Sequence, residues 1–334
     1  MPAEVGPIRR PHNRLRDGRV DPVIAILCPG QGSQAPGMLT PWLELPGSAE
    51  LLARLSEAAG LDLQALGTSA DADQIRDTAI AQPLIVASSL VALEALAQRV
   101  GPQHQWAQAT AGHSVGEYAA AVAAGVLSDA DAVGLVAARG RAMATAAAQT
   151  PTGMSAVIGG EPDAVLQALA GLELVPANVN GGGQVVAAGA LTALAQLKDN
   201  PPPKARVIPL PVAGAFHTHY MAGAVEAVQA AADGIAPADP QLSILTNGDG
   251  SVVPQGSQVL ASMVAQIARP VRWDRCQATL VELGVHATIE LAPAGVLTGL
   301  ARRSMPDTEL VALKTPADLD TAATLITRTM EESR

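Results

Sequence analysis

The segment Gly112-His113-Ser114-Val115-Gly116 decides the fold class of this chain. A short alanine-rich stretch precedes it, and a helix is predicted directly after it at residues 117–124. Small residues on both sides of a serine let a strand turn sharply into a helix, which leaves the hydroxyl exposed above a sheet. The backbone N–H after the serine then points at a bound carbonyl oxygen, beside the positive end of the helix. In a chain so rich in Gly and Ala, this short pattern alone indicates a chance match and a functional serine about equally.

A second stretch places a loop at the same edge of the sheet. Residues 23–28, VIAILC, are continuously apolar, which is typical of a strand covered on both faces. The loop PGQGSQ at residues 29–34 follows at the carboxyl end of that strand, where α/β proteins bind ligands. A phosphate-binding loop is the alternative, and it is disfavoured because G-x-G-x-x-G and the P-loop lysine are both missing here.

The rest of the chain divides into a core and an insertion. Helices are predicted at residues 48–59 and 83–99, the second with Pro83 in its first turn. After residue 148 the pattern becomes β-α-β-β-α-β, the order of a ferredoxin-like subdomain. Its predicted strands are residues 154–158, 174–178, 184–188 and 206–211, and its helices are 162–170 and 191–197. We predict an α/β-hydrolase-like core at 21–148 and 213–330, a ferredoxin-like subdomain at 149–212, and a flexible arm at 1–20.

Composition excludes several classes of protein. The chain has 334 residues, of which 49% are hydrophobic, so it can bury a large core. The net charge of −10 gives no field that attracts nucleic acid, and an acidic partner would need a local basic patch. The two distant cysteines fit a reducing, cytoplasmic compartment. The longest apolar run, residues 118–127, is too short for a bilayer, and the N-terminus lacks the apolar segment of a signal peptide.

Four motifs occur in an order that resembles a known family. They are PGQGSQ at 29–34, GHSVGEY at 112–118, AFHTHYM at 215–221 and PVRW at 270–273, with an arginine-containing helix after the second. The chain thereby resembles malonyl-CoA:acyl carrier protein transacylases over residues 23–303. It is also similar to the acyltransferase domains of polyketide synthases and to the transacylase subunit of malonate decarboxylase systems. The resemblance implies a monomeric enzyme that moves malonyl from malonyl-CoA to acyl carrier protein in fatty acid biosynthesis. It implies no cofactor, no metal, no nucleic acid and no membrane partner.

The nucleophile needs a base, and histidine is the residue type that serves. Among six histidines the resemblance selects His217, with His219 as the nearest competitor. No Asp or Glu between Ser114 and His217 has the context of a triad acid. The resemblance therefore implies a Ser–His dyad, in which a backbone carbonyl, expected at Arg272, holds His217.

Arg139 is the candidate for choosing the acyl group. In a helix over residues 131–147 it falls on the apolar face with Val136 and Met143. A planar guanidinium suits a carboxylate bound through two parallel hydrogen bonds. A structural ion pair with a core Asp or Glu explains the same pattern equally well. The resemblance favours the first reading, because it places at this position an arginine that binds the free carboxylate of malonyl.

The two glycine-containing motifs predict an oxyanion hole made by the backbone N–H groups of Gln31 and Val115. The cleft lining is implied by the resemblance alone. The expected cleft lining is Gln82, His113, Asn178, Asn180 and Phe216.

Two other functions remain open at this level. A serine thioesterase or other hydrolase would share the nucleophile and base, but it would use an acidic third residue and need no buried Arg139. A non-catalytic carrier-binding subunit would be signalled by loss of Ser114, His217 or Arg139, and all three are present.

Overall fold

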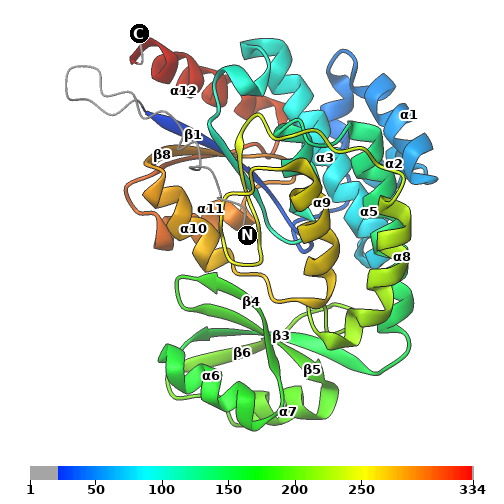
Figure 1. Ribbon diagram of the computed structural model, residues 1–334, viewed down its shortest axis with the longest axis vertical. Helices are drawn as coiled ribbons and strands as arrows, with labels where there is room; N and C mark the ends of the chain where they lie inside the picture. The colour runs from blue at the N-terminus through cyan, green and yellow to red at the C-terminus, as the bar shows by residue number, and fades with distance from the viewer. Residues whose placement is uncertain (1–21, 333–334) are drawn as a thin grey trace, which may run out of the picture.

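The computed structural model describes residues 22–332, and the chain forms a large part and a small part (Figure 1). The predicted arm at 1–20 lies outside the described residues. The large part is built on a five-stranded parallel sheet in the order β7-β2-β1-β8-β9. Its strands are β1 Val23–Cys28, β2 Ala109–Gly112, β7 Ser243–Leu245, β8 Val285–Glu290 and β9 Glu309–Ala312.

Helices cover both faces of this sheet. They are α1 Ser48–Ala59, α2 Leu63–Thr68, α3 Thr78–Val100, α4 Gly116–Ala123, α5 Asp129–Ala147, α8 Ala222–Ala232, α9 Gly256–Ala265, α10 Trp273–Glu282, α11 Val296–Ser304 and α12 Leu319–Glu332. Short 3-10 helices are Thr40–Glu44, Gln74–Arg76, Gln103–Gln105, His219–Met221, Gln266–Ala268 and Pro316–Asp318.

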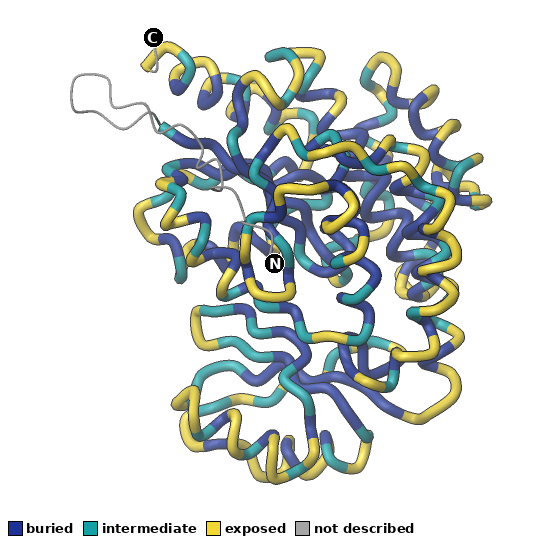
Figure 2. Tube along the Cα trace, viewed as in Figure 1, coloured by how far each residue is buried: buried dark blue, intermediate teal, exposed yellow. Residues whose placement is uncertain are grey.

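The central strand β1 explains why the sequence reads as continuously apolar there. Ile24 and Ile26 pack into the larger hydrophobic cluster, whose other members come mainly from α1, α3, α4 and α5. Ala25 and Leu27 face a smaller cluster with α10 and α11. Because side chains alternate between the faces of a strand, a strand covered on both sides needs apolar residues at every position. Figure 2 shows the result, with buried residues along the central strands and exposed ones on the outer turns of the helices.

Helix α3 differs from the sequence prediction in two ways. It begins at Thr78, so Pro83 lies inside the helix and not in its first turn. The reason is the Asp77 side chain, which accepts a hydrogen bond from the N–H of Ala79 (2.8 Å) and caps the helix earlier. Among the described helices, α3 is the one that is long and apolar enough to cross a membrane, and the apolar run at residues 118–127 is not. However, 83% of the most apolar window of α3 is buried inside the protein. It packs here as a core helix.

The small part is an antiparallel sheet in the order β4-β5-β3-β6, with two helices on its outer face (Figure 1). Its elements are β3 Thr152–Gly159, α6 Pro162–Gly171, β4 Val175–Gly181, β5 Gln184–Ala190, α7 Leu191–Asp199 and β6 Ala205–Pro209. Each predicted element is present, with ends that differ by a few residues. Val157, Leu169 and Leu197 belong to a separate small core beneath the helices. The other face of the sheet looks toward the large part, and the candidate site lies between them.

Candidate active site

Ser114 lies on a strained turn between β2 and α4. Its φ is +53°, in the left-handed region that costs a non-glycine residue about 1–3 kcal/mol. A Cβ on Gly112 would lie 2.0 Å from the carbonyl carbon of Gly116, and one on Gly116 would lie 2.1 Å from the carbonyl oxygen of Cys28. Only glycine fits at either place, because the start of α4 lies against Gly112 and the end of β1 lies against Gly116.

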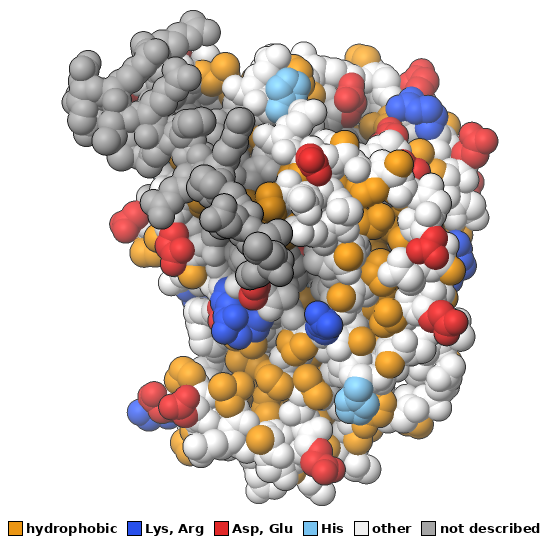
Figure 3. Space-filling view, viewed as in Figure 1, with side chains coloured by type: hydrophobic (Ala, Val, Ile, Leu, Met, Phe, Trp, Pro, Cys, Tyr) orange, Lys and Arg blue, Asp and Glu red, His pale blue; other side chains and the backbone are white. Residues whose placement is uncertain are grey.

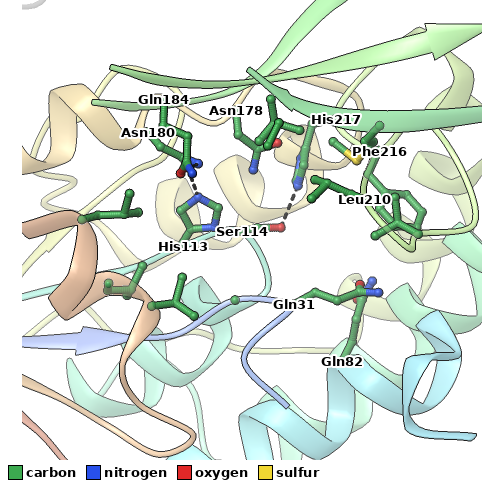
Figure 4. Close-up of a pocket in the computed structure, with 18 of the residues that line it drawn as sticks. Gln31, Gln82, His113, Ser114, Asn178, Asn180, Gln184, Leu210, Phe216 and His217 are labelled. Carbon is green, nitrogen blue, oxygen red and sulfur yellow. Dashed lines mark hydrogen bonds between the residues drawn. The ribbon is translucent and has the colours of Figure 1, made fainter. Parts of the chain in front are cut away.

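His217 is the partner of Ser114. The Ser114 Oγ lies 2.7 Å from His217 Nε2 (Figure 4). On the other side of the ring, His217 Nδ1 lies 2.9 Å from the backbone oxygen of Gln266, and the N–H there donates to this carbonyl. The imidazole is thereby left with Nε2 as the nitrogen that can accept the serine proton.

The expectation that Arg272 supplies this carbonyl is wrong. The Arg272 oxygen accepts hydrogen bonds from the N–H groups of Arg275 and Cys276, at the start of α10. Its guanidinium pairs with Asp274, with Nε–Oδ1 at 2.9 Å and Nη2–Oδ2 at 2.7 Å. The chain between α9 and α10 turns into a short 3-10 helix at Gln266, and this turn brings the carbonyl of Gln266 to His217.

The electrostatic surroundings keep His217 neutral. Burial, and after it the nearby charge of Arg139, lower the pKa of His217 to about 3, and the hydrogen bond to the Gln266 backbone opposes both effects. A neutral imidazole at ordinary pH is the form that can act as a general base.

The choice between the two neighbouring histidines gives a first prediction. His217→Ala should slow acylation of Ser114 by on the order of 10² or more, since the serine then lacks its base. His219→Ala is the matched control, because His219 is exposed and contacts the ring of Tyr220 instead of Ser114. Single-turnover acylation followed by mass spectrometry measures both rates. The opposite ranking of the two variants would show that His219 is the base.

Arg139 is buried at 1% exposure, directly beside the nucleophile. Its Nη1 donates to Gln82 Oε1 (2.6 Å), and its Nη2 donates to Gln266 Oε1 (2.9 Å) and lies 3.4 Å from Ser114 Oγ. No ion pair formed within residues 22–332 involves Arg139, so a structural salt bridge does not account for it. Burial lowers the pKa of Arg139, and Tyr118 and Glu117 act in the opposite direction. The two side chains that accept hydrogen bonds from Arg139, Gln82 and Gln266, are neutral amides. They orient the cation but do not neutralise its charge.

Ser114, His217 and Arg139 line a cavity of about 200 Å³. All five residues expected to line a cleft are found there, as are Gln31, Ser114, Arg139 and His217. Asn180 Oδ1 bonds His113 Nε2 (2.9 Å), so His113 is turned toward the small sheet and away from Ser114 Oγ (Figure 4). The other lining residues are Gly30, Met143, Met154, Ala156, Gln184, Val186, Leu210, Val212, Val296, Leu297 and Leu300.

The backbone N–H groups of Gln31 and Val115 are available to a ligand. Within the described part of the chain neither donates to a protein acceptor. Gln31 follows β1 and Val115 follows Ser114, so the two groups come from neighbouring strand ends. This is the kind of paired donor that stabilises a developing oxyanion.

Comparison with known proteins decides the family. A family model described as an acyl transferase domain matches residues 26–325. The chain belongs to the acyl transferase domain family. A Mycobacterium tuberculosis relative named malonyl CoA-acyl carrier protein transacylase is 53% identical over 303 residues, which cover 91% of this chain and 100% of the relative. An Escherichia coli relative of the same name is 33% identical over 308 residues, 90% of this chain and 99% of its own.

Solved structures resemble this acyl transferase over the same extent. The crystal structure of MCAT from Mycobacterium tuberculosis has a TM-score of 0.87 at 53% identity, and the match covers 90% of this chain and 99% of that one. A malonyl-transacylase solved in complex with a type II polyketide acyl-carrier protein has a TM-score of 0.85 at 30% identity, with 91% and 99% covered. Both the large and the small part of the acyl transferase therefore belong to the shared architecture.

The acyl transferase site also holds three polar residues that the sequence did not single out. Glu117, Asn247 and Gln266 are all buried. Asn247 Oδ1 accepts from the N–H of Ser114 (2.7 Å), and Glu117 accepts from Asn247 N–H and from Gln266 Nε2, each at 2.6 Å. Burial raises the pKa of Glu117 to about 8, against the effects of Asn247, Arg139 and Gln266. Glu117 stands in the quoted GHSVGEY motif, but an acidic residue in the first turn of a helix has an ordinary explanation, so its position gave no distinct signal.

Proposed function

We propose that this chain transfers a malonyl group from malonyl-CoA to the phosphopantetheine thiol of an acyl carrier protein, through a malonyl-Ser114 intermediate. The observation that carries the proposal is the buried cation of Arg139. Two amide side chains hold its guanidinium, and Arg139 Nη2 lies 3.4 Å from Ser114 Oγ. In a malonyl ester on Ser114 the free carboxylate is three bonds from Oγ, which is within reach of Arg139. The names of the relatives that share the whole fold support the same substrate and acceptor.

In the first half-reaction His217 Nε2 takes the proton of Ser114 Oγ while Oγ attacks the thioester carbon. The negative charge that develops on the carbonyl oxygen is stabilised by the N–H groups of Gln31 and Val115. The intermediate collapses, the carbon–sulfur bond breaks, and coenzyme A leaves with the proton from His217. Arg139 holds the substrate carboxylate through two charge-assisted hydrogen bonds.

The second half-reaction runs the same steps with the carrier thiol. His217 accepts the thiol proton, the sulfur attacks the ester carbon of malonyl-Ser114, and the serine oxygen leaves with the proton returned by His217. The chemistry uses no metal and no redox cofactor. We assign it to fatty acid biosynthesis in the cytoplasm by a monomer, with no nucleic acid or membrane partner. A polyketide or malonate decarboxylase carrier is the alternative acceptor.

A hydrolase is less well supported by the site. The Nδ1 partner of His217 is the carbonyl of Gln266 and not a carboxylate, so the third residue of a hydrolase triad is not at that position. A buried cation beside the serine has no use in hydrolysing a neutral ester.

One experiment tests the proposed reaction. The protein is incubated with malonyl-CoA, and its intact mass is followed before and after addition of a carrier protein that bears phosphopantetheine. We expect the gain of one malonyl group, then its disappearance from the enzyme and its appearance on the carrier. Loss of the adduct to water at the same rate without a carrier would identify a thioesterase instead. Absence of any adduct, without release of coenzyme A from malonyl-CoA, would contradict both.

We also propose the finer description of the fold. The parallel sheet with its strand–turn–helix at Ser114 supports an α/β-hydrolase-like core, over residues 21–148 and 213–330. The chain order β3-α6-β4-β5-α7-β6 and the sheet order β4-β5-β3-β6 support a ferredoxin-like subdomain at 149–212.

The carrier requires a local basic surface on an acidic enzyme. On the face shown in Figure 3 acidic side chains are spread around the outline, and basic ones are few and dispersed. Helix α11 offers a better candidate, because Leu297 and Leu300 line the cavity and exposed Arg302 and Arg303 follow on the same helix. Arg303 lies against the β4–β5 turn, where a Cβ on Gly182 would be 2.9 Å from its Nε. The basic end of α11 therefore follows directly, on the same helix, the residues that line the cavity.

This surface gives a second prediction. Arg303→Glu should raise the KM for the carrier by on the order of 10 and leave acylation by malonyl-CoA nearly unchanged, because a charge at the rim of an interface mainly steers association. The effect should shrink at high ionic strength. Arg54→Glu is the control, since exposed Arg54 on α1 pairs with Asp129 away from the cavity. Equal carrier kinetics in both variants would place the docking surface elsewhere.

A further inference from the structure

Gln266 connects the base and the substrate-binding cation. Its backbone oxygen accepts from His217, and its side-chain oxygen accepts from Arg139. Its amide nitrogen Nε2 faces three acceptors: Glu117 Oε2 at 2.6 Å, the Ser114 carbonyl at 3.1 Å and Asn247 Oδ1 at 3.1 Å. Only one orientation of the amide satisfies both sides, with its oxygen toward the cation and its nitrogen toward the acceptors.

Glu117 determines that orientation more strongly than the other two acceptors. Its side chain is 2% exposed, and each of its oxygens accepts a hydrogen bond at 2.6 Å, Oε1 from Asn247 N–H and Oε2 from Gln266 Nε2. Each oxygen of Glu117 faces an N–H donor, the Asn247 backbone on one side and the Gln266 side chain on the other, so both positions require an acceptor. The amide of Gln266 must therefore direct its nitrogen at Glu117.

The placement of Glu117 also leaves Arg139 free for a ligand. None of the ion pairs of residues 22–332 joins the two, although the charge of each acts on the other. Glu117 reaches the cation only through the amide of Gln266, which donates to Glu117 and accepts from Arg139. Because it does not contact the guanidinium, it does not compete with a substrate carboxylate. Arg139 Nε is buried with no hydrogen-bond partner in the described chain, which leaves a donor unused.

We infer that Glu117 is a positioning residue for malonyl selection, which fixes the side-chain amide of Gln266 so that its oxygen orients Arg139 toward the acyl group on Ser114. The inference rests on the proposed role of Arg139 as the site of the malonyl carboxylate. Glu117 does not touch the reacting atoms. It acts through one amide on the cation that does.

The isosteric variant Glu117→Gln tests this relay. A glutamine offers one acceptor and one donor, so its amide nitrogen must face either Asn247 N–H or Gln266 Nε2. The conflict is relieved when the Gln266 amide turns over, and its nitrogen then faces the guanidinium. We expect kcat/KM for malonyl-CoA, relative to acetyl-CoA, to fall about tenfold or more, mainly through a higher KM for malonyl-CoA.

Glu290→Gln is the matched control. Glu290 is equally buried and also accepts two N–H hydrogen bonds, from Leu297 (2.9 Å) and Thr298 (2.8 Å), but it caps α11 and contacts neither Gln266 nor Arg139. Its malonyl-to-acetyl ratio should stay at the parental value. An equal fall in the two variants would show that loss of any buried carboxylate changes the ratio, and this would overturn the inference.

A double-variant cycle separates this inference from the proposed function. In an Arg139→Ala background Glu117→Gln should cause no further fall in the ratio, because the group it positions is gone. If Arg139→Ala fails to change the ratio, the proposed role of Arg139 is wrong and this inference falls with it. If Arg139→Ala lowers the ratio and Glu117→Gln alone does not, only the role of Glu117 is wrong.

A second variant covers the case in which Glu117→Gln does not fold. Exchanging the two side chains, Glu117→Gln with Gln266→Glu, keeps one carboxylate and one amide in the same volume. It places the carboxylate directly on Arg139, so the malonyl-to-acetyl ratio should fall at least as far. A parental ratio in this folded double variant would overturn the inference.

Discussion

Ser114→Ala is expected to abolish the stable gain of a malonyl group and to lower malonyl transfer by about 10⁴ or more. Removal of the nucleophile from a serine enzyme leaves only the contribution of substrate binding and the oxyanion donors. Ser114 Oγ lies 2.7 Å from His217 Nε2, and no other hydroxyl within residues 22–332 forms a hydrogen bond with His217. Intact-mass measurement after incubation with malonyl-CoA, with peptide mapping, checks the result.

Ser88→Ala is the matched control for that variant. Ser88 is buried on α3, where its hydroxyl bonds the carbonyl of Leu84 (2.8 Å), so the same chemical change occurs away from the site. We expect a parental adduct in this control. A malonyl adduct that persists in Ser114→Ala on a different residue would show that the covalent intermediate was assigned to the wrong side chain.

Arg139→Ala is expected to lower kcat/KM for malonyl-CoA by about 10²–10⁴ and to raise the relative activity with acetyl-CoA. Hydrogen bonds to charged groups contribute about 1.5–3 kcal/mol each, and in the proposed complex two of them would hold the malonyl carboxylate. Acetyl has no carboxylate, so it loses nothing directly and gains the space that the guanidinium vacates. Arg139→Lys should be intermediate, because an ammonium group cannot donate in parallel to both carboxylate oxygens.

The measurement compares kcat/KM for malonyl-CoA and acetyl-CoA in the parent and both variants. Arg141→Ala is the control, since Arg141 is on the same helix but exposed, 3.4 Å from the carbonyl of Ala59. An equal loss with both substrates in Arg139→Ala, with the fold retained, would mean that Arg139 has a structural role and does not select the acyl group.

Much of the local structure could be predicted because its causes are local. Continuous apolar residues at 23–28 indicated a strand with both faces covered, and β1 is central in the sheet. The glycines around Ser114 indicated a sharp turn. The backbone of Gly116 leaves no space for a side chain at Gly112, and the end of β1 leaves none at Gly116. The start of α3 was missed because the Asp77 cap and Pro83 are both plausible signals, and only the capping hydrogen bond at Ala79 shows which one begins the helix.

The sequence by itself determined the residue types of the site and the order in which the chain supplies them. A serine between glycines, a histidine-containing turn and an arginine on an apolar helix face are local patterns, and the structure brings Ser114, His217 and Arg139 together. The tertiary structure alone decided which groups hold them. Gln266 and not Arg272 orients His217. Asn247 accepts a hydrogen bond from the backbone of Ser114, and Glu117 accepts one from the side chain of Gln266. A hydrogen bond is decided within a few tenths of an ångström, and segments more than a hundred residues apart meet at such distances only after the sheet and its helices have packed.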